Sequence, residues 1–418
     1  MGAKARKPGK AKVRQSATAA GVSWVWAGTA MVVATAAAAA AFLLRGAAIG
    51  GPAASIVRVR LITNGARTDT VVEGDLSADL WGDDSGWRYY TTNGTRIEHF
   101  GELEPNSTVM GVEPGQHFHW PEYELGTRFE VSGLSTLKEG AKPVELEALS
   151  ASPRLFYVHN FLTRKETAAL ISVAEDQSNP YSIRPSTTGH KSWTQGGEGE
   201  TASTRTSLNG FDVNSPTAMA VKRRAFDLLR IPYDERLADG IQILRYKLKQ
   251  AYIPHHDSFS FDTSQDFNWN PQAGGANRLA TVLLYLSDEK GVEGGQTVFP
   301  LAPLPNVTSG SDGGSTQLTQ MVAAAPKGED QISSLVAGTE AGQEGLFKSG
   351  EESWEAQLVK QCYTRLSVKP KRGDAVLFYS QHADGSMDGT SLHGGCPVLS
   401  GTKWAANVWV WSAPRFGM

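Results

Sequence analysis

Two residues of types that bind transition metals stand two positions apart in the 418-residue chain: His255 and Asp257, in the segment AYIPHHDSF. Alternate residues of a β-strand project from the same face, so an imidazole and a carboxylate at this spacing can reach one ion. His393, in TSLHGGC, offers a second imidazole. Two imidazoles and one carboxylate form the facial ligand set of non-haem Fe(II) sites. The common alternative for His255 and Asp257 is a solvent-facing histidine beside an aspartate.

A lysine, Lys403, stands ten residues after His393, at the start of the aromatic segment KWAANVWVWS. Its ammonium would supply a point charge and three hydrogen-bond donors to a carboxylate. A dicarboxylate such as 2-oxoglutarate could bind this lysine at one end and chelate Fe(II) with its keto acid end. The alternative is an ordinary lysine at the end of a strand.

Short apolar runs surround these residues, each rich in β-branched or aromatic side chains and bounded by Gly, Pro, Asn or Asp. They are DGIQILRYKLK, RLATVLLYLS, GDAVLFYS and KWAANVWVWS. Strands in this series predict an antiparallel sandwich or jelly roll. Helices are predicted in FLTRKETAALISVAED, with Thr163 as N-cap, and from Pro216 to Leu229. The predicted fold class is α+β, mainly β: a double-stranded β-helix flanked by helices.

The chain divides into parts by composition. Residues 55–149 read as a small β-rich domain of alternating apolar and polar runs. Its His117 and His119 are interpreted as strand histidines without a chemical role. Residues 153–412 contain the proposed metal ligands. Within them, residues 301–366 are rich in Gly, Ser, Thr, Ala and acidic residues, which predicts a long, partly disordered surface insertion that cannot bury a core.

The N-terminus predicts a membrane anchor. Residues 1–21 carry six basic and no acidic residues, and residues 22–44 carry no charge. A helix of that length can cross the roughly 30 Å hydrocarbon core. The positive-inside rule then leaves residues 1–21 in the cytoplasm and the rest in the lumen, a type II topology. The alternative is a cleaved signal or transit peptide. Three sequons, at Asn93, Asn106 and Asn306, fit a lumenal location.

Charge and cysteine content exclude some classes of function. The formal net charge is -3, with 40 basic and 43 acidic residues, which offers no global attraction for nucleic acid. Two cysteines are too few for a disulfide scaffold or a cysteine zinc site, although they could form one bridge. We therefore expect no nucleic-acid partner.

From Pro153 to Trp411, apart from the insertion, the chain resembles the prolyl 4-hydroxylase family. The resemblance rests on blocks in the family's order: PRLFYVHNFLT, RTS from Arg205 to Ser207, ILRYKLKQAYIPHHD, NRLATVLLYLSD, GGQTVFP, VKPKRGDAVLFYS and SLHGGCPVLSGTKWAANVWV. It implies three iron ligands, namely His255, Asp257 and His393. It also makes Lys403 the main partner of the distal carboxylate of 2-oxoglutarate, assisted by Tyr246 and Thr297. The alternative for these two is a core tyrosine and a strand threonine.

The resemblance also implies residues that line a peptide channel, where aromatic faces suit a proline-rich peptide. They are Tyr252, Arg278 and Trp409. Each could instead be a packing residue. Trp411 departs from the family pattern, in which a histidine is more usual, and this leaves the peptide preference open. Cys362 and Cys396 lie where the family tends to carry cysteines, so they are either bridged in an oxidising lumen or two free buried thiols.

The implied activity is hydroxylation of peptidyl proline at C4, of the procollagen-proline 4-dioxygenase type. It uses Fe(II), 2-oxoglutarate, O2 and L-ascorbate, releases succinate and CO2, and acts on a proline-rich secreted protein. The expected location is the endoplasmic reticulum or Golgi membrane. Two alternatives remain: a 2-oxoglutarate dioxygenase acting on lysine, a cytosolic regulator or a nucleobase, and a catalytically inactive jelly roll that serves as a binding subunit.

Overall fold

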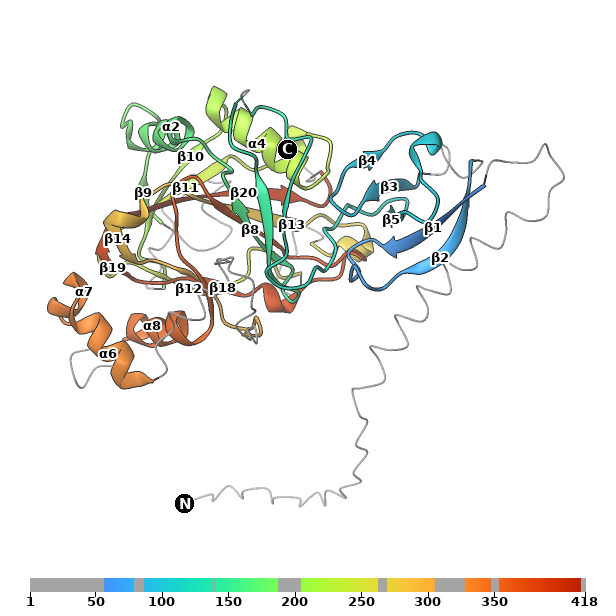
Figure 1. Cartoon of the computed structure of the whole chain (residues 1–418). Coiled ribbons are helices and arrows are strands. Elements are labelled where there is room, and N and C mark those ends of the chain that lie inside the picture. Colours follow the sequence, from blue (N-terminus) through green and yellow to red (C-terminus); the bar gives the residue numbers. More distant parts are fainter. Residues whose placement is uncertain are drawn as a thin grey trace, which may run out of the picture.

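The computed structural model describes residues 56–78, 86–137, 140–186, 204–261, 269–304, 328–346 and 353–414 (Figure 1). The predicted cytoplasmic tail 1–21, the predicted anchor 22–44 and the sequon at Asn306 lie outside these ranges. Within them, no helix has the length and apolar character needed to cross a membrane.

The largest sheet in the described part of the chain has nine strands in the order β6-β7-β8-β17-β13-β20-β11-β10-β9. Its strands along the chain are β6 (Arg128–Glu130), β7 (Glu145–Ser150), β8 (Leu155–His159), β9 (Arg184–Pro185), β10 (Leu208–Asp212), β11 (Ile241–Tyr246), β13 (Arg278–Tyr285), β17 (Ala375–Tyr379) and β20 (Lys403–Trp411). All its pairings are antiparallel. The predicted strands around the proposed metal ligands are confirmed.

A second sheet carries two of the three proposed metal ligands. Its order is β12-β18-β15-β16. The strands are β12 (Tyr252–His255), β15 (Thr297–Phe299), β16 (Leu366–Val368) and β18 (His393–Gly395). A two-stranded ribbon of β14 (Val292–Gly294) and β19 (Val398–Gly401) extends beside it. Phe299 and Val368 of the second sheet pack with Tyr285 and Phe378 of the large sheet, so the two sheets enclose a common core as in a jelly roll.

Helices cover the opposite face of the large sheet. α2 (Arg164–Glu175) begins with a capping box, in which Thr163 and Glu166 each satisfy a backbone N–H of the other, so the predicted N-cap is confirmed. α4 (Pro216–Leu228) begins after Ser215, as predicted. Period-two alternation divides β13 between the two layers: Val282 packs with the helices, whereas Tyr285 faces the second sheet.

The small N-terminal sheet is shorter than predicted. In the described residues its order is β2-β1-β5-β3-β4. The strands are β1 (Ile56–Thr63), β2 (Val72–Ser77), β3 (Arg88–Thr91), β4 (Arg96–Ile97) and β5 (Thr108–Val112). The boundary at residue 149 is wrong, because β6 and β7 pair in the large sheet. A strand-like sequence does not show which strand it pairs with. Composition alone therefore assigned β6 and β7 to the preceding small domain.

The predicted insertion 301–366 differs from the expectation where it is described. It contains the helices α6 (Glu329–Ala337), α7 (Glu340–Gln343) and α8 (Trp354–Thr364). Ile332 and Val336 of α6 are buried together with Val359 of α8 and Leu399 of β19. The expectation that this segment cannot bury a core is therefore wrong for these helices. In Figure 1 they lie at one end of the molecule, and the small sheet lies at the other.

Short 3-10 helices join several of these elements. They are Phe100–Glu102, Glu235–Leu237, Pro271–Ala273, Glu289–Gly291 and Gly389–Ser391. His117 and His119, interpreted as strand histidines without a chemical role, lie outside the strands, and each connects distant segments: His117 Nε2 lies 2.6 Å from the carbonyl oxygen of Ser412, and His119 Nε2 lies 3.0 Å from that of Gln381. Burial lowers the pKa of His119 to about 4, so its ring is neutral.

Candidate active site

Strand pairing brings the predicted metal ligands together. β12 and β18 are antiparallel neighbours, and His255 is directly paired with His393. Asp257 lies two residues beyond His255 in a bend, outside β12, so the expectation that both ligands project from one strand is wrong for Asp257. One potential ligand atom from each of the three residues lies within 4.8 Å of the other two, and no other such cluster occurs in the described ranges. The separations suit a common ion.

Backbone carbonyls fix both imidazole rings. His255 Nδ1 lies 2.9 Å from the carbonyl oxygen of Ile253, and His393 Nδ1 lies 3.0 Å from that of Ser391. A carbonyl oxygen only accepts, so each Nδ1 carries the proton and donates it. Each Nε2 then keeps its lone pair, and these atoms face Asp257 at 3.8 Å and 3.6 Å. This is the orientation that outer hydrogen bonds impose on metal-binding histidines.

The Asp257 carboxylate is held from the large sheet. Thr281 Oγ1 donates to Asp257 Oδ2 at 2.7 Å. Burial opposes ionisation, but His393, His255, Arg278 and the Thr281 hydroxyl outweigh it and lower the pKa of Asp257. Burial and the neighbouring His393 lower the pKa of His255. A neutral imidazole and an ionised carboxylate are the protonation states that a divalent metal requires. The site therefore fits Fe(II).

Lys403 is buried at the start of β20, paired in register with Tyr246 of β11. Its Nζ lies 5.3 Å from the ring centroid of Tyr246 and 5.9 Å from that of Tyr285. Burial lowers its pKa to about 7. Within the described ranges the ammonium has no carboxylate partner. A buried ammonium without a carboxylate partner, next to two tyrosine rings, fits a carboxylate ligand.

Thr297 connects this lysine pocket to the metal ligands. Its Oγ1 accepts a hydrogen bond from the Tyr285 hydroxyl at 3.0 Å. Thr297 is paired with Gly395, which lies two residues after His393 on β18. A Cβ on Gly395 would lie 3.7 Å from the Tyr246 hydroxyl, so this hydroxyl sits over the same strand. Two residues along a strand span about 6.8 Å, which places the two groups side by side.

The three residues expected to line a peptide channel also lie beside the metal ligands. The Tyr252 ring stacks on His255 with centroids 3.7 Å apart. The Arg278 guanidinium lies 3.5 Å from the Trp409 ring centroid and donates to the carbonyl oxygen of Asp257 at 3.2 Å. Burial raises the pKa of Tyr252, so its hydroxyl remains protonated. The structure thus brings together every residue that the sequence assigned to the site.

Two residues of this network were not identified from the sequence. Asp239 forms a 3.1 Å ion pair with Arg278, and the Trp411 indole donates to Asp239 at 3.1 Å. Trp411 stands where the family more often has histidine, and its indole N–H still donates to Asp239, the partner of Arg278. Thr281, the partner of Asp257, was also missed. The only indication in the sequence is that Thr281 falls on the same face of its strand as Leu283 and Tyr285, which face the second sheet.

Cys362 and Cys396 form a disulfide, which decides between the two expected alternatives. It joins α8 to the segment just after β18, three residues beyond His393. Both cysteines are buried in a cluster with Ala251, Val298 and Leu358. The covalent link therefore fixes α8 against the sheet that carries the metal ligands.

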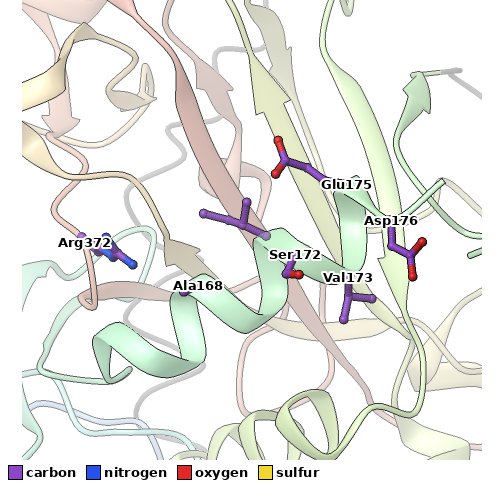
Figure 2. Close-up of a pocket in the computed structure, with 7 residues that line it drawn as sticks. Ala168, Ser172, Val173, Glu175, Asp176 and Arg372 are labelled. Atoms are coloured by element: carbon purple, nitrogen blue, oxygen red, sulfur yellow. The ribbon is translucent and has the colours of Figure 1, made fainter. Parts of the chain in front are cut away.

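A separate groove of about 590 Å³ lies along α2 (Figure 2). Its lining residues are Ala168, Ile171, Ser172, Val173, Glu175, Asp176 and Arg372. None of them belongs to the metal or lysine sites. The groove contains no pair of buried catalytic or metal-binding side chains. We therefore assign the active site to His255, Asp257 and His393 together with Lys403.

Comparisons with known proteins agree with this geometry. The family model of the 2OG-Fe(II) oxygenase superfamily matches residues 241–411, a range that includes His255, Asp257, His393 and Lys403. Probable prolyl 4-hydroxylase 3 of Arabidopsis thaliana is 33% identical over 266 residues, covering 63% of this chain and 71% of that protein. Probable prolyl 4-hydroxylase 8 of the same plant is 36% identical over 266 residues, covering 63% and 70%.

Among solved structures, the chain is similar to the viral collagen prolyl hydroxylase vCPH from Paramecium Bursaria Chlorella virus-1 in its 2OG complex. The identity is 18%, the coverage is 62% of this chain and 96% of that one, and the TM-score is 0.34. That superposition is too weak to support an inference. The sequence relatives are sufficient: the chain is a 2-oxoglutarate and Fe(II) dependent dioxygenase that belongs to the prolyl 4-hydroxylase family.

Proposed function

We propose that the chain hydroxylates peptidyl proline at C4, with Fe(II), O2 and 2-oxoglutarate, releasing succinate and CO2. The observation that carries this proposal is the convergence of His255, Asp257 and His393, with ligand atoms within 4.8 Å, beside the buried Lys403, which has no carboxylate partner among the described residues. Relatives named prolyl 4-hydroxylases support proline as the substrate residue. We infer that the substrate is a proline-rich secreted peptide or protein and that L-ascorbate keeps the iron reduced.

Each residue has a defined task in this proposal. His255, Asp257 and His393 hold Fe(II), which together with 2-oxoglutarate and O2 supplies the oxidising chemistry. Lys403 binds the distal carboxylate of 2-oxoglutarate, assisted by Tyr246 and Thr297. Tyr252, Arg278 and Trp409 orient the peptide, and the aromatic rings exclude water from the reacting atoms.

The direct test incubates residues 56–418 with Fe(II), 2-oxoglutarate and proline-rich peptides. Mass spectrometry should detect a 16 Da gain on proline, and succinate should form in equal amount. His255→Ala, Asp257→Ala and His393→Ala should each abolish both products, because losing one of three protein ligands destroys the metal geometry. Wild-type-like hydroxylation in any of the three would remove the triad assignment.

The same assay distinguishes the alternatives. Decarboxylation of 2-oxoglutarate without hydroxyproline on any proline-rich peptide would indicate a dioxygenase with a different protein substrate. Neither product, in a protein that binds Fe(II), would indicate an inactive binding subunit. The intact set of metal ligands and the buried lysine favour the active enzyme.

We further propose that the chain is a type II protein of the endoplasmic reticulum or Golgi membrane, with residues 22–44 as anchor. The basic flank and the uncharged run support this proposal. Asn93 and Asn106 are exposed and therefore accessible to glycosylation. A C-terminal tag should be protected from protease in intact microsomes, and the protein should shift in mass on deglycosylation. Digestion of the tag in intact microsomes would overturn the topology.

A further inference from the structure

The helices α6 and α7 pack on the strand that leads to Lys403. Leu399 of β19 is buried among Ile332 and Val336 of α6 and Ala341 of α7. A Cβ on Gly342 would lie 1.9 Å from the carbonyl oxygen of Val336, so α6 and α7 are in close contact. Figure 1 shows α7 next to β19, with α6 following on the side of α8. This helix pair is therefore seated on the ribbon beside the second sheet.

Glu340, the first residue of α7, binds the turn between β19 and β20. One carboxylate oxygen accepts hydrogen bonds from Ser400 Oγ at 3.0 Å and from the backbone N–H of Gly401 at 3.2 Å. Thr339 caps α7 by accepting from the N–H of Gly342 at 3.2 Å, which fixes the start of the helix and with it Glu340. A carboxylate on a helix of the inserted segment thus holds this turn.

The turn leads directly into Lys403, the first residue of β20. Gly401 has a φ of 78°, and a Cβ there would lie 1.9 Å from the carbonyl oxygen of Gly291, so the turn is tightly packed against the start of β14. Lys403 follows two residues later as the first residue of β20. Its Cδ lies 3.1 Å from the position of a Cβ on Gly295. The lysine side chain therefore packs closely against Gly295, the residue that follows β14.

A second contact joins the same helix to the same ribbon. Lys249 Nζ forms a 3.1 Å ion pair with Glu344 and donates to its carbonyl oxygen at 2.8 Å. The backbone N–H of Lys249 donates to the carbonyl oxygen of Val398 at 2.8 Å. The ribbon is therefore tied to the end of α7 as well as to its start.

We propose that the α6–α7 helix pair positions Lys403 for the distal carboxylate of 2-oxoglutarate, with Glu340 as a positioning residue for cosubstrate binding. This inference rests on the proposed function, because it assumes that Lys403 binds 2-oxoglutarate. Glu340 touches neither metal nor cosubstrate and acts through the turn. The inserted segment then supports the cosubstrate pocket through this turn, although its composition predicted a surface insertion that cannot bury a core.

The test titrates 2-oxoglutarate into anaerobic Fe(II) protein and follows the metal-to-ligand charge-transfer band. Glu340→Ala should raise the Kd for 2-oxoglutarate by about three- to tenfold, because it removes the two hydrogen bonds that the exposed Glu340 carboxylate accepts from the turn. Glu340→Gln should lie between it and the wild type, because the amide oxygen still accepts. In turnover, the KM for 2-oxoglutarate should rise with kcat retained. Amide hydrogen exchange of residues 399–403 should become faster.

Glu329→Ala is the matched control, because Glu329 is an exposed acid at the start of α6 and its carboxylate pairs with Lys360 of α8 at 3.2 Å. It should leave the Kd unchanged. If the wild type fails to bind 2-oxoglutarate, the proposed function is wrong. If the wild type binds and Glu340→Ala matches Glu329→Ala, the positioning role is wrong. A fall in Fe(II) affinity and melting temperature together with 2-oxoglutarate affinity would indicate general destabilisation and would also overturn it.

Discussion

The buried ammonium of Lys403 is the residue on which cosubstrate affinity should depend most. A charge-assisted hydrogen bond in a dehydrated pocket is worth about 1.5 to 3 kcal/mol. Lys403→Ala should therefore weaken 2-oxoglutarate binding by about ten- to a hundredfold or more, at about 1.4 kcal/mol per tenfold. Fe(II) binding should be retained, because Lys403 is not a ligand. The anaerobic charge-transfer titration measures both.

The pKa of Lys403 gives this prediction a pH dependence. Burial lowers the pKa from 10.5 to about 7, so above that value the amine must gain a proton before it pairs with a carboxylate. Affinity for 2-oxoglutarate should fall as the pH rises from 7 to 9. Lys403→Arg should be impaired but active, since its planar fork does not match an ammonium pocket. An unchanged Kd in Lys403→Ala would remove the cosubstrate role.

The Thr281 hydroxyl should matter for metal affinity without touching the metal. It donates to Asp257 Oδ2 at 2.7 Å and so fixes the carboxylate between the two histidines. Loss of an outer partner of a metal ligand typically costs about 10- to 100-fold in affinity. Thr281→Val, which keeps the shape, should weaken Fe(II) or Co(II) binding by that factor in calorimetry. Thr281→Ser keeps the hydroxyl and should bind nearly normally; equal affinity in both variants would contradict the role.

At the scale of strands and helices, local patterns predicted the elements but not their partners. The alternation of β20 places Lys403 and Trp409 on one face, and the segment around His255 was predicted as a strand. Thr281 was missed because it reaches the site through the register of the nine-stranded sheet, and Asp239 was missed because it lies before β11, next to the isolated bridge between Ala238 and Val410. α6 was missed because its apolar residues are few and stand in a polar segment, and Ile332 and Val336 are buried only together with residues outside the helix such as Leu399.

The disulfide between α8 and the end of β18 should contribute to stability through the loop it closes. The cysteines are 34 residues apart, and closing a loop of this length restricts the unfolded chain by about 2–4 kcal/mol. Cys362→Ser, Cys396→Ser and the double variant should lower the free energy of unfolding by similar amounts, measured by urea denaturation. Because Cys396 follows His393 closely, Fe(II) affinity should fall as well. Full stability of the reduced protein would contradict this contribution.

At the scale of the whole molecule, the small sheet and the dioxygenase fold share a core. Tyr90 and Met110 of the small sheet are buried in one cluster with Phe118, Trp120 and Leu228. The side chain of Asn64 donates to the carbonyl oxygen of His117 at 2.7 Å and accepts from the N–H of His119 at 2.8 Å. The small sheet is thus a structural partner of the enzyme fold, although composition suggested a separate domain.

Adjacent tyrosines of β3 allow a matched test of this shared core. Tyr90 contacts Phe118, with ring centroids 4.7 Å apart, whereas Tyr89 faces the small sheet's own cluster with Val59 and Leu61. Tyr90→Ala should cost about 3 kcal/mol or more, the range for large aromatic truncations in a core. The 2-oxoglutarate charge-transfer band should then disappear at lower urea. Tyr89→Ala leaves the Phe118 contact intact and should shift that midpoint less, while loosening β1 in hydrogen exchange. An unchanged midpoint in Tyr90→Ala would mean that the dioxygenase fold is stable without its small sheet.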